Sequence, residues 1–160
     1  MEFITSPNFR RGRTVPIDTL VIHYTASLSM EGTIAWFKNP DAQVSAHYVI
    51  GRDGRIVQMV NDNDVAWHAG ASKLYGRIGV NAFSIGIELV GTADSGFTDS
   101  QLRELYTQIA LIVTRYQVQS DHVVGHKFIS PGRKIDPDGY HNQFNWAKAR
   151  QVAQDALNHA

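Results

Sequence analysis

The clearest strand signal in the sequence is Thr19-Leu-Val-Ile-His-Tyr-Thr25. This nearly unbroken run of β-branched, aliphatic and aromatic residues, with one histidine inside it, is typical of a strand buried on both faces of a sheet. A second segment, Ser84-Ile-Gly-Ile-Glu-Leu-Val90, alternates instead. Because successive strand side chains point to opposite faces, we expect Ile85 and Ile87 on an apolar face and Glu88 on the other.

Three segments with helical spacing accompany these strands. The predicted helices run from Ser29 to Lys38, from Asp99 to Tyr116, and from Trp146 to about Asn158. Thr98 and Gln101 match a capping box before the second helix, and Asn145 can cap the third.

The remaining segments predict a hairpin, a short strand and loops. Residues 46–50 and 55–60 flank the strong turn signal Arg52-Asp53-Gly54, and Val123-Val124 is expected to be a short strand. Residues 61–82 form a long loop rich in glycine, asparagine and histidine, a length that is often functional.

The whole chain is predicted to be one domain. Residues 1–16 are polar and are expected to be an irregular, solvated lead-in. No repeat or linker divides residues 1–160, so the pattern predicts a single mixed α/β domain with a central mixed β-sheet and about three flanking helices.

Composition excludes several classes of function. The 15 lysine and arginine residues balance 15 aspartate and glutamate residues, which argues against nucleic acid as a partner. The absence of cysteine excludes disulfides, thiolate metal sites and cysteine nucleophiles. No apolar run matches a membrane span and no signal peptide is visible, so no membrane insertion and a cytoplasmic location are expected.

Three polar residues are predicted at strands or their ends. His23 lies within the first strand, His126 ends Val123-Val-Gly-His126, and Asp136 follows 10 positions later. Two imidazoles and a carboxylate are a known ligand set of catalytic zinc, with a fourth position left for water or substrate. Each residue taken singly also fits a structural role, such as a hydrogen-bonded core histidine or an aspartate that begins a turn.

Five blocks of sequence occur in order along most of the chain. They are Val21-Ile-His-Tyr-Thr-Ala26, Ser45-Ala-His-Tyr-Val-Ile50, Ala66-Trp-His-Ala-Gly70, Ser84-Ile-Gly-Ile-Glu-Leu89, and Val124-Gly-His126 with Pro131-Gly-Arg-Lys-Ile-Asp-Pro137. Together they resemble the zinc-dependent N-acetylmuramoyl-L-alanine amidases of the amidase-2 family. That family includes anhydro-muropeptide amidases, phage T7-type lysozymes and peptidoglycan recognition proteins.

The resemblance implies an activity and roles for particular residues. The activity is hydrolysis of the amide between N-acetylmuramic acid and L-alanine in peptidoglycan or muropeptides, by metal-activated water. His23, His126 and Asp136 would ligate Zn²⁺; T7-type members have a cysteine where this chain has Asp136. The resemblance also implies that Glu88 is the catalytic acid/base and that Lys134 stabilises the reacting oxygen.

The residue chemistry agrees with those roles. A carboxylate at Glu88 can take a proton from water and pass it to the leaving amine, and Gly86 on the same face would leave room for substrate. Lys134 lies two residues before Asp136, so both side chains share a side if the segment is extended. Without the resemblance, Glu88 and Lys134 would be interpreted as surface charges.

Five further residues are predicted to bind substrate. They are His47, Trp67, His68, Arg77 and Asn81. His47 and His68 can alternatively hydrogen-bond a metal ligand. Trp67 can stack on the substrate or serve as a core or lid aromatic residue, and Arg77 and Asn81 are candidates for binding muropeptide carboxylates or amides.

Other functions remain open at this point. A non-catalytic peptidoglycan-binding module is the main alternative, although such proteins typically lose a metal ligand. An iron oxygenase also uses two histidines and one carboxylate, but it would leave Glu88 and Lys134 without a role. We expect a monomer that acts in muropeptide recycling, or one that reaches the cell wall through phage lysis or a secretion system.

Overall fold

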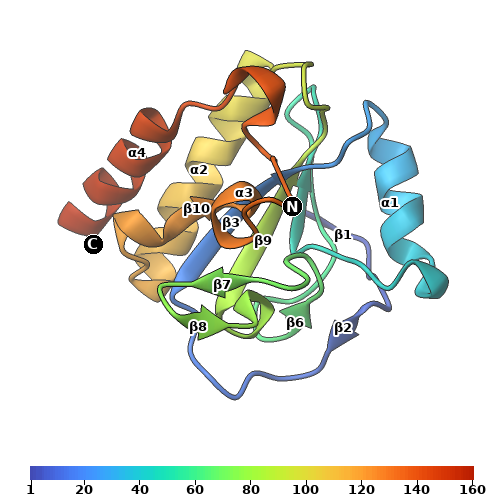
Figure 1. Ribbon diagram of the computed structural model, residues 1–160, viewed down its shortest axis with the longest axis horizontal. Coiled ribbons are helices and arrows are strands. Elements are labelled where there is room, and N and C mark those ends of the chain that lie inside the picture. Colours follow the sequence, from blue (N-terminus) through green and yellow to red (C-terminus); the bar gives the residue numbers. More distant parts are fainter.

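A six-stranded mixed sheet forms the centre of the computed structural model, which describes residues 1–160 (Figure 1). In spatial order its strands are β1 (Glu2–Phe3), β5 (Ile56–Gln58), β4 (Tyr48–Ile50), β9 (Ser84–Leu89), β3 (Thr19–Tyr24) and β10 (Val123–Gly125). Only β4 and β5, the predicted hairpin, pair antiparallel. The predicted single α/β domain with a mixed sheet is therefore confirmed.

The two strong strand signals become the central neighbours of the sheet. β3 and β9 pair in parallel along their whole length, with His23 opposite Glu88. Opposed residues point to the same face, so these two polar side chains project together. The other face carries Ile22 and Ile85, which are fully buried.

Helices cover the two faces of the sheet differently. The helices are α1 (Met30–Lys38), α2 (Asp99–Tyr116), α3 (His126–Ile129) and α4 (Trp146–Asn158), with short 3₁₀ helices at Pro40–Ala42, Val80–Phe83, Ser120–His122 and Gly139–His141. Figure 1 shows α2 and α4 side by side, with α1 on the far side of the strands. α2 and α4 pack on the face of Ile22 and Ile85, and together they form the largest hydrophobic cluster.

The opposite face holds two smaller apolar clusters. One gathers around Val21 and Phe83, and the other joins Phe37 of α1 to Val49 and Val57 of the hairpin. The polar side chains of the central strands share this face with both clusters. Two short antiparallel pairs complete the fold: β2 (Phe9–Arg10) with β6 (Val65–Ala66), and β7 (Lys73–Leu74) with β8 (Arg77–Ile78).

The bounds of the three predicted helices agree with α1, α2 and α4 to within one residue, and the Thr98–Gln101 capping box and the Asn145 cap are confirmed. The hairpin strands are shorter than predicted, and residues 61–82, expected to be a loop, contain β6, β7 and β8. No helix combines the length and the apolar character that crossing a membrane requires.

The lead-in, residues 1–16, differs from the expectation of an irregular, solvated segment. It contributes β1 and β2 to sheets, and Ser6 and Asn8 are buried. Asn8 Nδ2 lies 3.2, 2.9 and 3.0 Å from the carbonyl oxygens of Phe37, Asn39 and Val44, respectively. Short polar side chains that pair with distant carbonyls leave no hydropathy pattern, which explains why the sequence did not indicate this anchoring.

Replacing Asn8 should therefore destabilise the fold. Asn8→Ala removes a buried donor from several carbonyl groups, and we expect a loss of about 1–3 kcal/mol in the free energy of unfolding. Urea denaturation followed by circular dichroism measures this loss. Arg11→Ala is the control, because Arg11 is exposed in the same segment and should change stability by less than about 0.5 kcal/mol. Equal stability of the two variants would contradict the anchoring.

Candidate active site

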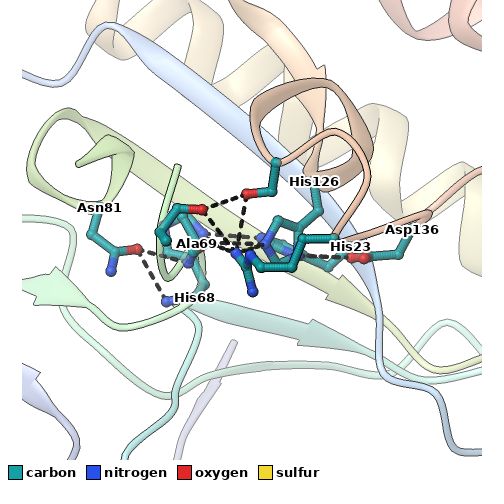
Figure 2. Close-up of polar contacts among 9 residues, drawn as sticks. His23, His68, Ala69, Asn81, His126 and Asp136 are labelled. Carbon is teal, nitrogen blue, oxygen red and sulfur yellow. Dashed lines mark hydrogen bonds and ion pairs between the residues drawn. The ribbon is translucent and has the colours of Figure 1, made fainter. Parts of the chain in front are cut away.

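Three buried side chains meet at the carboxyl ends of the central parallel strands (Figure 2). His23 lies near the end of β3, His126 follows β10, and Asp136 lies in the loop after α3. His23 Nδ1 lies 3.0 Å from His126 Nδ1 and 3.1 Å from Asp136 Oδ2. His126 Nδ1 lies 3.3 Å from the same oxygen. The structure thus brings together the three predicted metal ligands.

The hydrogen-bond partner of His126 determines which of its nitrogens carries the proton. His126 Nε2 lies 2.9 Å from the carbonyl oxygen of Ala69. A carbonyl oxygen only accepts, so Nε2 donates and Nδ1 of the neutral ring keeps its lone pair. That lone pair belongs to the nitrogen facing His23 and Asp136.

His23 is oriented by a longer chain of hydrogen bonds. Ser84 Oγ donates to the carbonyl of Val80 at 2.7 Å, so it accepts from His68 Nε2 at 3.0 Å. His68 Nδ1 is then an acceptor, and His23 Nε2 donates to it at 3.0 Å. His23 Nδ1 therefore also presents a lone pair to the cluster.

Three acceptor atoms with no proton between them repel one another unless a cation lies among them. Tetrahedral coordination with bonds of about 2.1 Å separates neighbouring ligand atoms by about 3.4 Å, close to the 3.0–3.3 Å found between these atoms. The donor set and its spacing therefore fit a metal ion held by His23, His126 and Asp136.

The ionisation states of these groups suit metal binding. Burial lowers the pKa of His23, which favours the neutral ring. Burial raises the pKa of Asp136, but the proximity of the His126 and His23 rings outweighs that effect and holds the pKa below its usual range. A neutral imidazole and an ionised carboxylate are the forms that bind metals.

Glu88 lies beside this cluster, as its register with His23 requires. Its Oε2 is buried and has no hydrogen-bond partner. Burial, and to a smaller extent the Asp136 carboxylate, raise the pKa of Glu88 well above its usual value, while Lys134 opposes them. A carboxyl group in this state is suited to accept and release protons.

A cavity of about 770 Å³ opens over the cluster. Its lining includes the three ligands, Glu88 and Lys134, together with Trp36, Trp67 and His68. The site thus combines candidate metal ligands, a carboxyl group and a cation in one opening.

Three of the predicted substrate-binding residues do not line this cavity. His47 is fully buried; its Nδ1 accepts from the backbone of Gly86 and its Nε2 donates to the carbonyl of Asp64, both at 3.0 Å. Arg77 pairs with Asp18 at 2.6 Å and covers the ring of Phe83.

Asn81, the third of these residues, binds the loop backbone. Its Oδ1 accepts from the N–H groups of His68 and Ala69.

Gly86 leaves room for a histidine ring and not for substrate. A Cβ atom added there would lie 2.5 Å from Cγ of His68. The small residue in β9 therefore lets the His68 ring lie against the strand, within reach of His23. The expectation that this space receives substrate is corrected.

Sequence reasoning missed several supporting groups. Ser84 orients His68, the carbonyl of Ala69 orients His126, and Arg133 Nη2 donates to that carbonyl at 2.8 Å. A backbone carbonyl leaves no trace in residue identity, and Ser84 resembles any serine at the start of a strand.

Comparison with known proteins gives concordant results. The family model described as N-acetylmuramoyl-L-alanine amidase matches residues 13–139. The 1,6-anhydro-N-acetylmuramyl-L-alanine amidase AmpD of Haemophilus influenzae is 49% identical over 66% of this chain and 56% of the relative. The N-acetylmuramoyl-L-alanine amidase AmiD of Escherichia coli is 34% identical over 88% of this chain and 54% of the relative. The chain thus spans little more than half the length of these curated relatives.

Solved structures share the fold over most of the chain. A crystal structure of an AmpD derivative superposes with a TM-score of 0.77 at 34% identity, covering 95% of this chain and 93% of that one. AmiD from E. coli, in complex with anhydro-N-acetylmuramic acid-L-Ala-D-γ-Glu-L-Lys, gives a TM-score of 0.79 at 32% identity, covering 89% and 60% of the two chains.

The burial of His47 predicts sensitivity to acid. Burial lowers its pKa from 6.5 to about 4, so the unfolded chain binds an extra proton between these values and stability falls as the pH drops through this window. In His47→Gln we expect the free energy of unfolding to fall by on the order of 3 kcal/mol less between pH 7 and pH 4 than in the wild type. Urea unfolding of metal-free protein across this pH range measures the difference. His159→Gln, at an exposed histidine, should leave the pH dependence unchanged. An unaltered dependence in His47→Gln would contradict the assignment.

Proposed function

The chain belongs to the amidase-2 family of N-acetylmuramoyl-L-alanine amidases, and we propose that it hydrolyses the amide between N-acetylmuramic acid and L-alanine. The observation that carries this proposal is the convergence of three lone-pair donors beside Glu88, whose Oε2 has no partner, inside one cavity. A binding module would need neither an orphaned carboxyl group nor an intact ligand set.

We infer that zinc is the metal. Two imidazoles and a carboxylate with tetrahedral spacing suit zinc and leave one position open. Bound there, zinc would supply Lewis acidity that polarises the scissile carbonyl and makes water easier to deprotonate. An iron oxygenase could use the same ligand types, but the adjacent Glu88 and Lys134 have roles in hydrolysis and none in that chemistry.

Glu88 is assigned the proton transfers. Its unpartnered Oε2 faces the cavity side of the sheet beside His23, so it can accept a proton from the attacking water. The same carboxyl group then returns the proton to the leaving nitrogen of L-alanine, which departs as an amine.

Lys134 is assigned to charge stabilisation. It lines the cavity, and its backbone N–H donates to the carbonyl of Ser130 at 3.0 Å, which fixes the loop that also carries Asp136. Its ammonium group would stabilise the negative charge that develops on the carbonyl oxygen of the substrate during attack.

Anhydro-muropeptides are the proposed substrates. The AmpD relative of H. influenzae is named for 1,6-anhydro-N-acetylmuramyl-L-alanine, and the AmiD complex holds an anhydro-muramyl tripeptide. Trp67 is the candidate for contact with the sugar or peptide, because it lines the cavity and is only half-buried. A role in muropeptide turnover follows from this substrate class.

The activity is tested with defined substrates. Purified protein should release free tripeptide from anhydro-N-acetylmuramyl-tripeptide, leaving an intact sugar, as read by mass spectrometry. A chelator should abolish the release and added zinc should restore it, because His23, His126 and Asp136 then regain their ion. N-acetylmuramyl-tripeptide without the anhydro ring, run in parallel, measures the sugar preference. An uncut substrate in the presence of bound zinc would contradict the amidase assignment.

Glu88→Gln separates proton transfer from metal binding. The variant keeps the shape of the side chain and leaves all three ligands in place, so zinc content should match that of the wild type. Turnover should fall about a hundredfold or more, because the amide cannot accept the proton of water. Glu2→Gln, at an exposed glutamate on the edge strand, is the matched control and should retain full activity. Undiminished turnover in Glu88→Gln would refute the proposed role.

A further inference from the structure

Two consecutive residues of the long loop, His68 and Ala69, support both candidate histidine ligands. The ring of His68 accepts the Nε2–H of His23 at 3.0 Å, and the carbonyl of Ala69 accepts the Nε2–H of His126 at 2.9 Å. The orientation of both imidazoles therefore depends on where one dipeptide lies (Figure 2).

Asn81 holds that dipeptide through its backbone. The Asn81 side chain lies 3.1 Å from the backbone nitrogen of His68 and 2.8 Å from that of Ala69. Both partners are N–H donors, so the atom that faces them is the carbonyl oxygen Oδ1, whose two lone pairs suffice for both. Figure 2 shows this oxygen between the two backbone groups.

The position of Asn81 in the chain links the loop to the catalytic strand. Asn81 belongs to the 3₁₀ helix Val80–Phe83, which leads directly into β9. That strand carries Ser84, which orients His68, and Glu88, which lies beside His23. The short segment 81–84 thus holds the dipeptide in two ways: Asn81 binds its backbone N–H groups, and Ser84 binds the His68 ring.

Arg133 provides further support for the dipeptide, through the carbonyl of Ala69. Its Nη2 donates to the carbonyls of Ala69 and Ala71 at 2.8 and 3.0 Å and to Ser130 Oγ at 3.0 Å. Ala69, whose carbonyl orients His126, is therefore held at two points. Its N–H donates to Asn81, and its carbonyl accepts from the guanidinium group of Arg133, in the loop that carries Asp136.

We propose that Asn81 is a positioning residue of the metal centre, which holds His68 and Ala69 so that both imidazoles present Nδ1 to the ion. This inference rests on the proposed function, because it assumes that His23 and His126 bind the metal. It assigns Asn81 a role different from substrate binding, in agreement with its place outside the cavity lining. Outer partners of metal-ligating histidines typically contribute 10- to 100-fold to metal affinity, and Asn81 acts on two such partners at once.

The experiment measures zinc affinity in variants of the whole chain. Asn81→Ala removes the acceptor, and we expect its zinc dissociation constant to rise about tenfold or more in competition with a chelator. Asn81→Asp keeps an oxygen that can accept from both N–H groups, so its affinity should stay within about threefold of the wild type. Asn63→Ala, at an exposed asparagine, is the matched control and should bind zinc as the wild type does.

A second readout distinguishes positioning from simple structural support. Nitrogen-15 NMR of the histidine rings in metal-free protein should show His23, His68 and His126 as Nε2–H tautomers in the wild type. In folded Asn81→Ala we expect mixed tautomers at these rings, while His47 keeps its wild-type signals. If Asn81→Ala fails to fold, Asn81→Ser carries the test, because its shorter side chain should lose affinity relative to Asn81→Asp.

The outcomes separate this inference from the function on which it rests. Wild-type affinity and tautomers in Asn81→Ala, or in Asn81→Ser if that variant is used, would overturn the role of Asn81 and leave the amidase assignment intact. Failure of the wild-type protein to bind zinc would overturn both. Weakened binding and mixed tautomers in Asn81→Ala, with near-wild-type affinity in Asn81→Asp, would support the inference. Weakened binding with wild-type tautomers would contradict it.

Discussion

The parallel pairing of β3 with β9 is the constraint on which the rest of this structure depends. Its register places His23 opposite Glu88 and Ile22 opposite Ile87. Because strand side chains alternate, one face becomes apolar and is sealed by α2 and α4, while the other keeps polar groups between two small apolar clusters. His23 and Glu88 are therefore carried by the two central strands, whose opposite faces pack into the largest hydrophobic cluster.

Burial and hydrogen bonding explain how the chain holds three mutually repelling acceptor atoms together. His23, His126 and Asp136 are buried, and each imidazole is hydrogen-bonded on its outer side. The outer chains of hydrogen bonds end at the backbone carbonyls of Val80 and Ala69, which accept hydrogen bonds and have no proton to donate. Protons are thus kept on the outer nitrogens, and the inner lone pairs stay available to a cation.

The fold and the ligand set could be predicted largely from the sequence, whereas the supporting groups could not. Periodicity indicated the long helices and the central strands, because burial of one face makes apolar residues recur with the period of the helix or strand. His47 and Arg77 share sequence blocks or neighbourhoods with residues that line the cavity. They bind the carbonyl of Asp64 and the carboxylate of Asp18 away from it. Asn8 and Ser6 are buried anchors in a segment that composition alone marks as solvated.

The sequence by itself determined the α/β class and the two faces of the Ser84–Leu89 strand. Through resemblance it also predicted the residues proposed to bind metal and move protons. Those features depend on residue type and local spacing, which the chain states directly. Only the tertiary structure decided that Gly86 makes room for the His68 ring, that Ala69 orients His126 and that Asn81 holds both loop residues. These contacts join backbone atoms and side chains from distant segments, and a backbone carbonyl or N–H is the same in every residue, so no pattern of residue types can show where it will point.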